Sequence, residues 1–405
     1  MTGTADGTQV GVIVELEVGA VAHGGHCVAR GPDGRVVFVR HTLPGEIVRA
    51  EITDERPGYL RADAVEILRE APERVSPPCP YAGPDRCGGC DFQHVDPAAQ
   101  RELKAAVVRE QLARIGRLAP EEIDALRVTV SALPGGPLGW RSRLRYTVDA
   151  AGRAGLLKHR SHEVVPVESC AIATPAVRDA PVTGREWPDA DAVEVVASSG
   201  GDRTVTALGG DRPARRIDGP DRVVEEAGGR TWRVDPAVFW QVHPAAADAF
   251  VGSALRMLDP RPGERAWDLY GGAGTFAAAL ALAVGEQGAV TLVESDERAV
   301  FAASANLADL PQVKVVHSPV ERMQVRGRPD VVVLDPPRAG AGTRVVRRLI
   351  ESGPRAVAYV ACDPAAFARD VATFRGAGWR LAEVDAYDAF PMTHHVECVG
   401  LLVPE

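Results

Sequence analysis

Several features that mark membrane and secreted proteins are missing from this sequence. No run of apolar residues is long enough to span a bilayer, and the polar N-terminus has neither the basic start nor the apolar core of a signal peptide. These absences argue against a transmembrane segment and against export. We therefore expect a cytoplasmic protein without a membrane partner, and we expect it to be a monomer.

Positive charge is also in deficit. The 405 residues include 46 Lys and Arg against 55 Asp and Glu, which gives a formal net charge of −9. This balance argues against indiscriminate nucleic-acid binding, so any contact with RNA has to use local basic patches. The length itself predicts two or three domains.

Cysteines are few and odd in number. Seven cysteines in a reducing compartment are better explained as metal ligands or nucleophiles than as a disulfide framework. Four of them, Cys79, Cys87, Cys90 and the distant Cys170, could supply the thiolates that a 4Fe–4S cluster or a zinc ion requires. Zinc sites more often use two CxxC pairs or Cys/His mixtures, so we favour a structural 4Fe–4S cluster, with zinc as the alternative and unligated thiols as a third.

A fifth cysteine, Cys362, follows an apolar run at residues 355–360 that predicts a buried strand. Pro364 is typical of the first position of a helix, with Asp363 as its cap. Cys362 is therefore expected in a strand-to-helix turn, where an α/β protein exposes working side chains and the helix N-terminus lowers a thiol pKa. The alternative is a small buried apolar residue.

The N-terminal segment, from Gln9 to about Leu68, contains five short alternating runs separated by Gly, Pro and Asp turn signals. This spacing predicts a small five-stranded OB-like β-barrel. Such barrels offer a face for single-stranded nucleic acid, although a docking or purely structural role is the alternative. Gly19, Gly24-Gly25, Val36-Val37-Phe38-Val39 and Pro44-Gly45-Glu46 make the segment resemble a TRAM domain.

The middle of the chain contains a helical pattern at residues 97–117 and then a basic strand. Arg141, Arg143 and Arg145 alternate along it, and residues 141–160 contain six Lys and Arg against the single acid Asp149. A basic strand with flanking aromatic residues suits phosphate contact and base stacking in RNA. A charged, solvated edge strand is the alternative.

The last third alternates strands and helices, which predicts a doubly wound Rossmann-like α/β domain with the pattern of a class I methyltransferase. Its first turn, residues 268–276, is rich in glycine and suits the close approach of a nucleotide. Glu294 ends the second strand, where it can accept both ribose hydroxyls. The predicted domains are residues 8–69 (barrel), 75–228 (a smaller central α+β domain) and 230–405 (the α/β domain).

Four pieces of sequence make the resemblance specific: Phe239-Trp240-Gln241-Val242, Asp335-Pro336-Pro337-Arg338, Cys362, and Phe390 to Glu397. Together they resemble the RNA 5-methyluridine (uracil-C5) methyltransferase family, in the branch with a TRAM domain and an iron–sulfur cluster. The resemblance covers nearly the whole chain. It implies S-adenosylmethionine as cofactor, with a cofactor site that carries over to Gln241, Tyr270, Thr275, Glu294 and Asp335.

The resemblance also implies the chemistry. A thiolate added to carbon 6 of uracil makes carbon 5 a nucleophile for a sulfonium methyl group, and a base must then remove the carbon 5 proton. Carried over, Cys362 is the thiol and Glu397 the base. This chain departs from the family where Thr275 replaces a usual Asn, and where Ala361-Cys362-Asp363-Pro364 replaces Ser-Cys-Asn-Pro.

Two other functions compete with this one. A methyltransferase of small molecules would need neither an RNA-type barrel nor a covalent thiol, and a non-catalytic RNA-binding protein need not keep both reacting groups. RNA is therefore the expected partner, and the barrel and cluster favour ribosomal over transfer RNA by family analogy alone.

Overall fold

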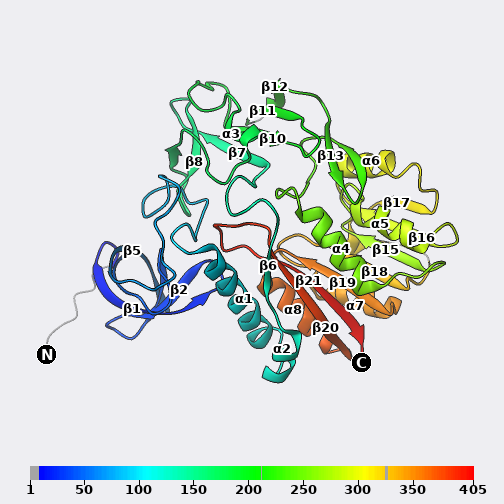
Figure 1. The fold of residues 1–405 in the computed structure, drawn as a ribbon, viewed down its shortest axis with the longest axis horizontal. Coiled ribbons are helices and arrows are strands. Elements are labelled where there is room, and N and C mark those ends of the chain that lie inside the picture. Colours follow the sequence, from blue (N-terminus) through cyan, green and yellow to red (C-terminus); the bar gives the residue numbers. More distant parts are fainter. Residues whose placement is uncertain (1–8, 211, 324–326) are drawn as a thin grey trace.

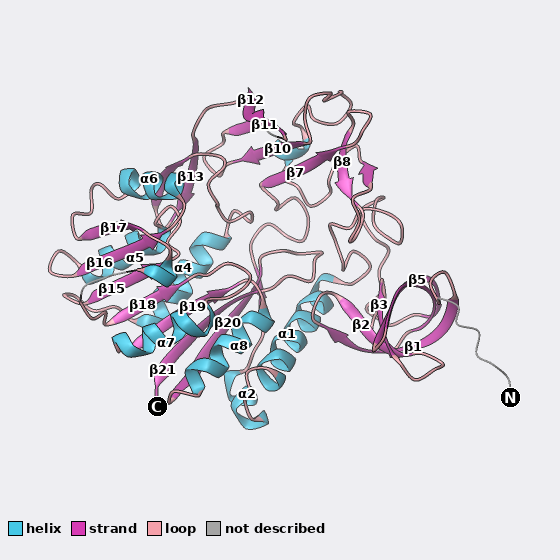
Figure 2. Ribbon diagram, turned by 180° about the vertical axis from the view of Figure 1, so that it is seen from behind, coloured by secondary structure: helices cyan, strands magenta, loops and turns pink. Residues whose placement is uncertain are grey.

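The computed structural model describes residues 9–210, 212–323 and 327–405. Figure 1 shows a barrel near the N-terminus and a large α/β sheet on opposite sides of the molecule, with a second, antiparallel sheet above and between them. The same arrangement is seen from behind in Figure 2. Among the helices of the described ranges, none has the length and apolar composition needed to cross a membrane.

The N-terminal barrel is closed and has the strand order β1-β2-β3-β5-β4, which confirms the five-stranded prediction. Alternate residues point inward, so that Leu16, Val37, Val39 and Leu60 are almost completely buried in its core. The strands are β1 (Ile13–Ala22), β2 (His26–Arg30), β3 (Val36–Arg40), β4 (Ile47–Arg56) and β5 (Tyr59–Arg69).

The antiparallel sheet has six strands in the order β12-β11-β10-β7-β8-β9. Leu144 and Tyr146 of β7 point into its core beside Trp140 and Trp187. The strands are β7 (Arg143–Val148), β8 (Ala154–Leu157), β9 (Val164–Pro166), β10 (Ala192–Ala197), β11 (Arg203–Gly209) and β12 (Arg212–Asp218), with α3 (Pro175–Arg178) in a connection and the hairpin β13 (Val223–Ala227) and β14 (Arg230–Val234) following.

The C-terminal sheet has eight strands in the order β17-β16-β15-β18-β19-β21-β20-β6. It is parallel apart from β21, which runs antiparallel to both of its neighbours. This is the predicted doubly wound architecture. Its strands are β15 (Arg265–Leu269), β16 (Ala289–Glu294), β17 (Val313–His317), β18 (Val331–Leu334), β19 (Ala356–Ala361), β20 (Trp379–Asp388) and β21 (Glu397–Pro404); its helices are α4 (Ala246–Leu258), α5 (Thr275–Val284), α6 (Glu297–Asn306), α7 (Gly342–Ser352) and α8 (Pro364–Arg375), with a 3₁₀ turn η1 (Val320–Arg322).

The eighth strand, β6 (Val130–Ala132), comes from the region expected to form the central domain. It pairs in parallel with the end of β20. Helices α1 (Pro97–Arg114) and α2 (Pro120–Leu126) pack beside it, and Val108, Leu112 and Ile123 share a core with Phe367 of α8. The three-domain division stays a prediction, but α1, α2 and β6 pack as part of the C-terminal sheet.

Candidate active site

The glycine-rich turn after β15 is shaped by close packing. A Cβ at Gly271 would lie 2.5 Å from Leu292 Cγ, so only glycine fits there. Gly274 caps α5 at a φ of 100°, a left-handed conformation that favours glycine. Glu294 accepts a hydrogen bond from the Gly272 amide at 3.0 Å, which ties the end of β16 to this turn.

A small pocket of about 60 Å³ lies above this turn. It is lined by Gln241, Tyr270, Thr275 and Asp335, together with Phe239 and Trp240. Glu294 is joined to the pocket through Gly272, so the structure brings all five predicted cofactor residues to one edge of the sheet. Burial, and then the charge of Glu294, raise the pKa of Asp335 to about 7.

Cys362 and Glu397 lie near each other at the ends of two neighbouring strands, β19 and β21. The β19–β21 ladder ends with Ala361 opposite Cys398, so Cys362 directly follows the last paired residue of β19 and Glu397 directly precedes its partner on β21. Opposed residues of an antiparallel pair lie about 5 Å apart at Cα and share a face of the sheet. Because β21 is antiparallel, its first residue lies at the edge where the parallel strands end.

Burial disfavours the charged forms of both the Cys362 thiol and the Glu397 carboxyl. Burial raises the pKa of Glu397 well above its usual range, and Asp335 adds to this effect while Arg338 opposes it. Burial, followed by the charge of Glu397, raises the pKa of Cys362 to about 12. The prediction that the helix N-terminus lowers this thiol pKa is wrong, because Cys362 is half-buried beside carboxyl groups.

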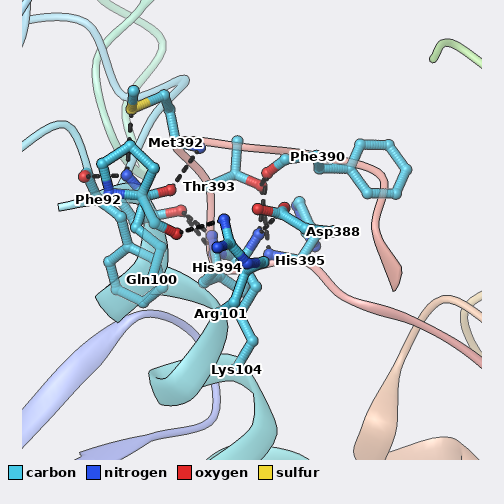
Figure 3. Close-up of polar contacts among 12 residues, drawn as sticks. Phe92, Gln100, Arg101, Lys104, Asp388, Phe390, Met392, Thr393, His394 and His395 are labelled. Carbon is cyan, nitrogen blue, oxygen red and sulfur yellow. Dashed lines mark hydrogen bonds and ion pairs between the residues drawn. The ribbon is translucent and has the colours of Figure 1, made fainter. Parts of the chain in front are cut away.

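The loop between β20 and β21, which leads into Glu397, is fixed by polar contacts (Figure 3). Gln100 of α1 accepts a hydrogen bond from the Met392 amide at 2.9 Å. Lys104, one helical turn further, is 2.5 Å from Asp388 and donates to the Phe390 carbonyl at 3.1 Å. Asp91 accepts from the His394 amide at 3.1 Å and lies 2.6 Å from His394 Nδ1.

Sequence reasoning missed these supporting residues. Gln100 and Lys104 are almost completely buried and lie on the same stripe of α1 as Val108 and Gln111. The signal was present as polar residues spaced like the apolar face of the helix, a pattern that is ordinarily taken for a solvated surface.

The four predicted ligand cysteines line one pocket of about 530 Å³, although they come from segments far apart in the chain. Arg141, Arg145, Lys158 and Arg160 line it too, and positive charge there suits a group held by four thiolates. Gly88 packs so closely that an added Cβ would lie 2.3 Å from the His159 amide nitrogen. Among the described residues, no three His, Cys, Asp or Glu side chains are grouped as a ready site for a metal ion.

The two arginines of the basic strand β7, Arg143 and Arg145, lie in different environments. The Arg143 side chain is 12% exposed, lies 3.3 Å from Glu225, and donates to the Val238 carbonyl at 2.6 Å. It is therefore a structural residue, in disagreement with the predicted RNA contact. Arg145, two residues along on the same face of the strand, is exposed, and it remains a candidate for RNA contact.

Family models match three stretches of the chain. The TRAM domain matches residues 7–65, the methyltransferase small domain matches residues 233–359, and tRNA (Uracil-5-)-methyltransferase matches residues 327–404. The first stretch contains nearly all of the closed barrel, and the last contains Asp335, Cys362 and Glu397.

Known proteins are similar over almost the full length. An RNA methyltransferase of Streptomyces avermitilis is 47% identical, with 96% of this chain and 98% of that protein covered. The 23S rRNA (uracil(1939)-C(5))-methyltransferase RlmD of Chromohalobacter salexigens is 33% identical, with coverages of 98% and 89%. The crystal structure of Pyrococcus abyssi tRNA (uracil-54, C5)-methyltransferase with S-adenosyl-L-homocysteine has the same fold, with a TM-score of 0.73, 21% identity and coverages of 96% and 99%.

These matches favour an RNA methyltransferase over the two alternatives considered from the sequence, a small-molecule methyltransferase and a non-catalytic RNA-binding protein. The chain belongs to the S-adenosylmethionine-dependent RNA uracil-C5 methyltransferases.

Proposed function

We propose that this protein methylates carbon 5 of a uridine in ribosomal RNA through a covalent bond between Cys362 and carbon 6. The observation that carries the proposal is the β19–β21 register, which brings Cys362 and Glu397 near each other at the carboxyl edge of the sheet. A nucleophile and a base that act on adjacent ring carbons of one uracil must lie this close together.

The reaction begins at carbon 6 of the uracil. The Cys362 thiolate bonds to carbon 6, and the electron pair of the 5,6 double bond becomes available at carbon 5. S-adenosylmethionine, when bound, would supply the methyl group to carbon 5 and leave as S-adenosylhomocysteine. Glu397 then takes the carbon 5 proton, the double bond re-forms, and the carbon–sulfur bond breaks to release Cys362. The raised pKa of Glu397 makes its ionised form a stronger base than an exposed carboxylate.

We assign the cofactor contacts to Gln241, Tyr270, Thr275, Glu294 and Asp335. Four of these line one pocket, and Glu294 is bonded to the glycine-rich turn that closes it. Glu294 at the end of β16 suits the ribose hydroxyls, and the glycine-rich turn above α5 suits the close approach of the ligand backbone.

We assign Cys79, Cys87, Cys90 and Cys170 to a 4Fe–4S cluster with a structural role. Their shared, arginine-lined pocket supports four thiolates around one group. Anaerobically purified protein should be brown, with broad visible absorption that dithionite bleaches. Colourless protein with stoichiometric zinc would support the alternative metal instead.

Ribosomal RNA is favoured over transfer RNA by the 33% identity to the Chromohalobacter salexigens enzyme, which acts on 23S rRNA. Mapping 5-methyluridine in ribosomal and transfer RNA from a strain that lacks the gene separates the two substrates. Loss of a methyl group from transfer RNA alone would reverse this assignment.

The mechanism is tested by separating the two reacting groups. Glu397→Gln keeps the nucleophile, so the methylated adduct should form and persist as a denaturation-resistant protein–RNA species that carries label from methyl-labelled cofactor. The Cys362→Ala/Glu397→Gln double variant should form none. If the double variant still traps labelled RNA, Cys362 is not the nucleophile, and Cys398 is the next thiol to test.

A further inference from the structure

The turn between β1 and β2 of the barrel, residues 23–25, reaches the edge of the C-terminal sheet at two points. His23 Nε2 lies 3.0 Å from Asp363 Oδ2, and Asp363 directly follows Cys362. Gly25 packs against His394, in the loop that leads into Glu397. One turn of the barrel therefore contacts both segments that carry the proposed reacting groups.

In the first contact, the two oxygens of the Asp363 carboxylate have different partners. Oδ1 accepts from the Ala366 amide at 2.8 Å and caps α8, while Oδ2 faces His23. The negative charge of Asp363 opposes the formation of a thiolate at Cys362. A protonated His23 offsets that charge, and the hydrogen bond to Asp363 raises the pKa of His23, with the charges of Asp363 and of Glu110 on α1 acting in the same direction.

The second contact is steric. Gly25 has a φ of 79°, and a Cβ built there would lie 2.8 Å from His394 Cβ and 3.0 Å from Asp91 Cβ. His394 Nδ1 and Asp91 Oδ2 are 2.6 Å apart. Any larger residue at Gly25 would displace this pair, and with it the loop before Glu397.

We propose that residues 23–25 of the barrel are a positioning element of the catalytic centre, which fixes the Cys362 segment through Asp363 and the Glu397 segment through His394. This inference rests on the proposed function of Cys362 and Glu397. The His23 side chain is 37% exposed and that of Asp363 is 28% exposed, and ion pairs this open contribute little to folding. The role of His23 is therefore to hold and neutralise Asp363 rather than to stabilise the protein.

The contact between His23 and Asp363 is tested by single-turnover kinetics on the full protein with its RNA. In His23→Ala, the rate of adduct formation should fall about tenfold while the Kd for RNA stays within about twofold of the parent value. Asp363→Asn removes the charge that His23 offsets, so the His23→Ala/Asp363→Asn double variant should form the adduct faster than His23→Ala alone. If the contact were only structural, the His23→Ala/Asp363→Asn double variant would form the adduct no faster than His23→Ala.

The test of the Gly25 contact has a matched control in another turn of the same barrel. Gly34 has a φ of 83°, close to that of Gly25, but its added Cβ meets nothing within 4 Å. Gly25→Ala should slow release of the methylated adduct about tenfold, and Gly34→Ala should not. Equal behaviour of the two variants, or a His23→Ala effect confined to RNA affinity, would overturn the positioning role. If Cys362→Ala/Glu397→Gln traps RNA as well as Glu397→Gln does, the proposed nucleophile is wrong instead.

Discussion

Removing the amine of Lys104 should destabilise the protein strongly, because its ion-pair partner is buried. The Lys104 side chain is 0% exposed and that of Asp388 is 5% exposed, and the two are 2.5 Å apart. Breaking a buried pair by removing one partner costs about 3 to 5 kcal/mol, since the remaining charge has no partner and little water. In Lys104→Ala, Asp388 keeps its carboxyl group and the Phe390 carbonyl loses its donor.

Urea unfolding followed by circular dichroism measures this cost. With an m value of about 3 kcal/mol/M, the midpoint should fall by roughly 1 to 1.7 M. Lys104→Met/Asp388→Leu replaces the pair by apolar side chains and should recover most of the loss, because no buried charge remains. Lys158→Ala is the control, since Lys158 pairs at 2.8 Å with a Glu163 side chain that is 62% exposed. A midpoint for Lys104→Ala equal to that of the control would refute the reasoning.

Three further predictions concern the cysteine pocket, RNA contact and pH. Gly88→Ala should abolish the visible absorption of the proposed cluster, because its Cβ would meet the His159 backbone at 2.3 Å. Gly89→Ala, whose Cβ would meet Cys87 Sγ at 3.5 Å, should keep the spectrum. Arg145→Gln should reduce the slope of log Kd for RNA against log salt by about 1, whereas Arg143→Gln should lower the urea midpoint and leave that slope unchanged. The Asp335 carboxyl has a pKa of about 7 in the folded protein against an ordinary 3.8, so the folded state binds more protons between these values. The free energy of unfolding should therefore fall as pH rises from about 3.8 to about 7. In urea titrations, Asp335→Asn should flatten this pH dependence.

The sequence was sufficient to predict the strands and helices in which apolar residues recur with a regular period. The barrel strands alternate inward and outward residues, and the strands of the C-terminal sheet are short apolar runs between helices, so both folds were predicted. Their order along a parallel sheet also predicts that Asp335 and Cys362 lie near the same edge, because both follow strands that end there.

The rest depended on packing between distant segments. β6 has three residues, and nothing local indicates that Val130 pairs with Ala386. Arg143 and Arg145 lie on the same face of β7, and Arg143 is covered because it packs against Glu225, which lies far along the chain. The direction of the Cys362 pKa shift follows from burial beside Glu397, which a helix-capping pattern does not contain.

The place of β21 in the sheet also constrains the order of folding. β21 follows β20 in the chain but lies between β19 and β20, with a ladder on each side. β20 and β6 are therefore joined to the parallel strands only through β21, and the pairing of β6 with β20 is a contact of large sequence separation, which favours slow closure of the sheet. The same insertion brings Glu397 to Cys362, so a folding intermediate without β21 would have its thiol in place but not the opposing carboxyl group.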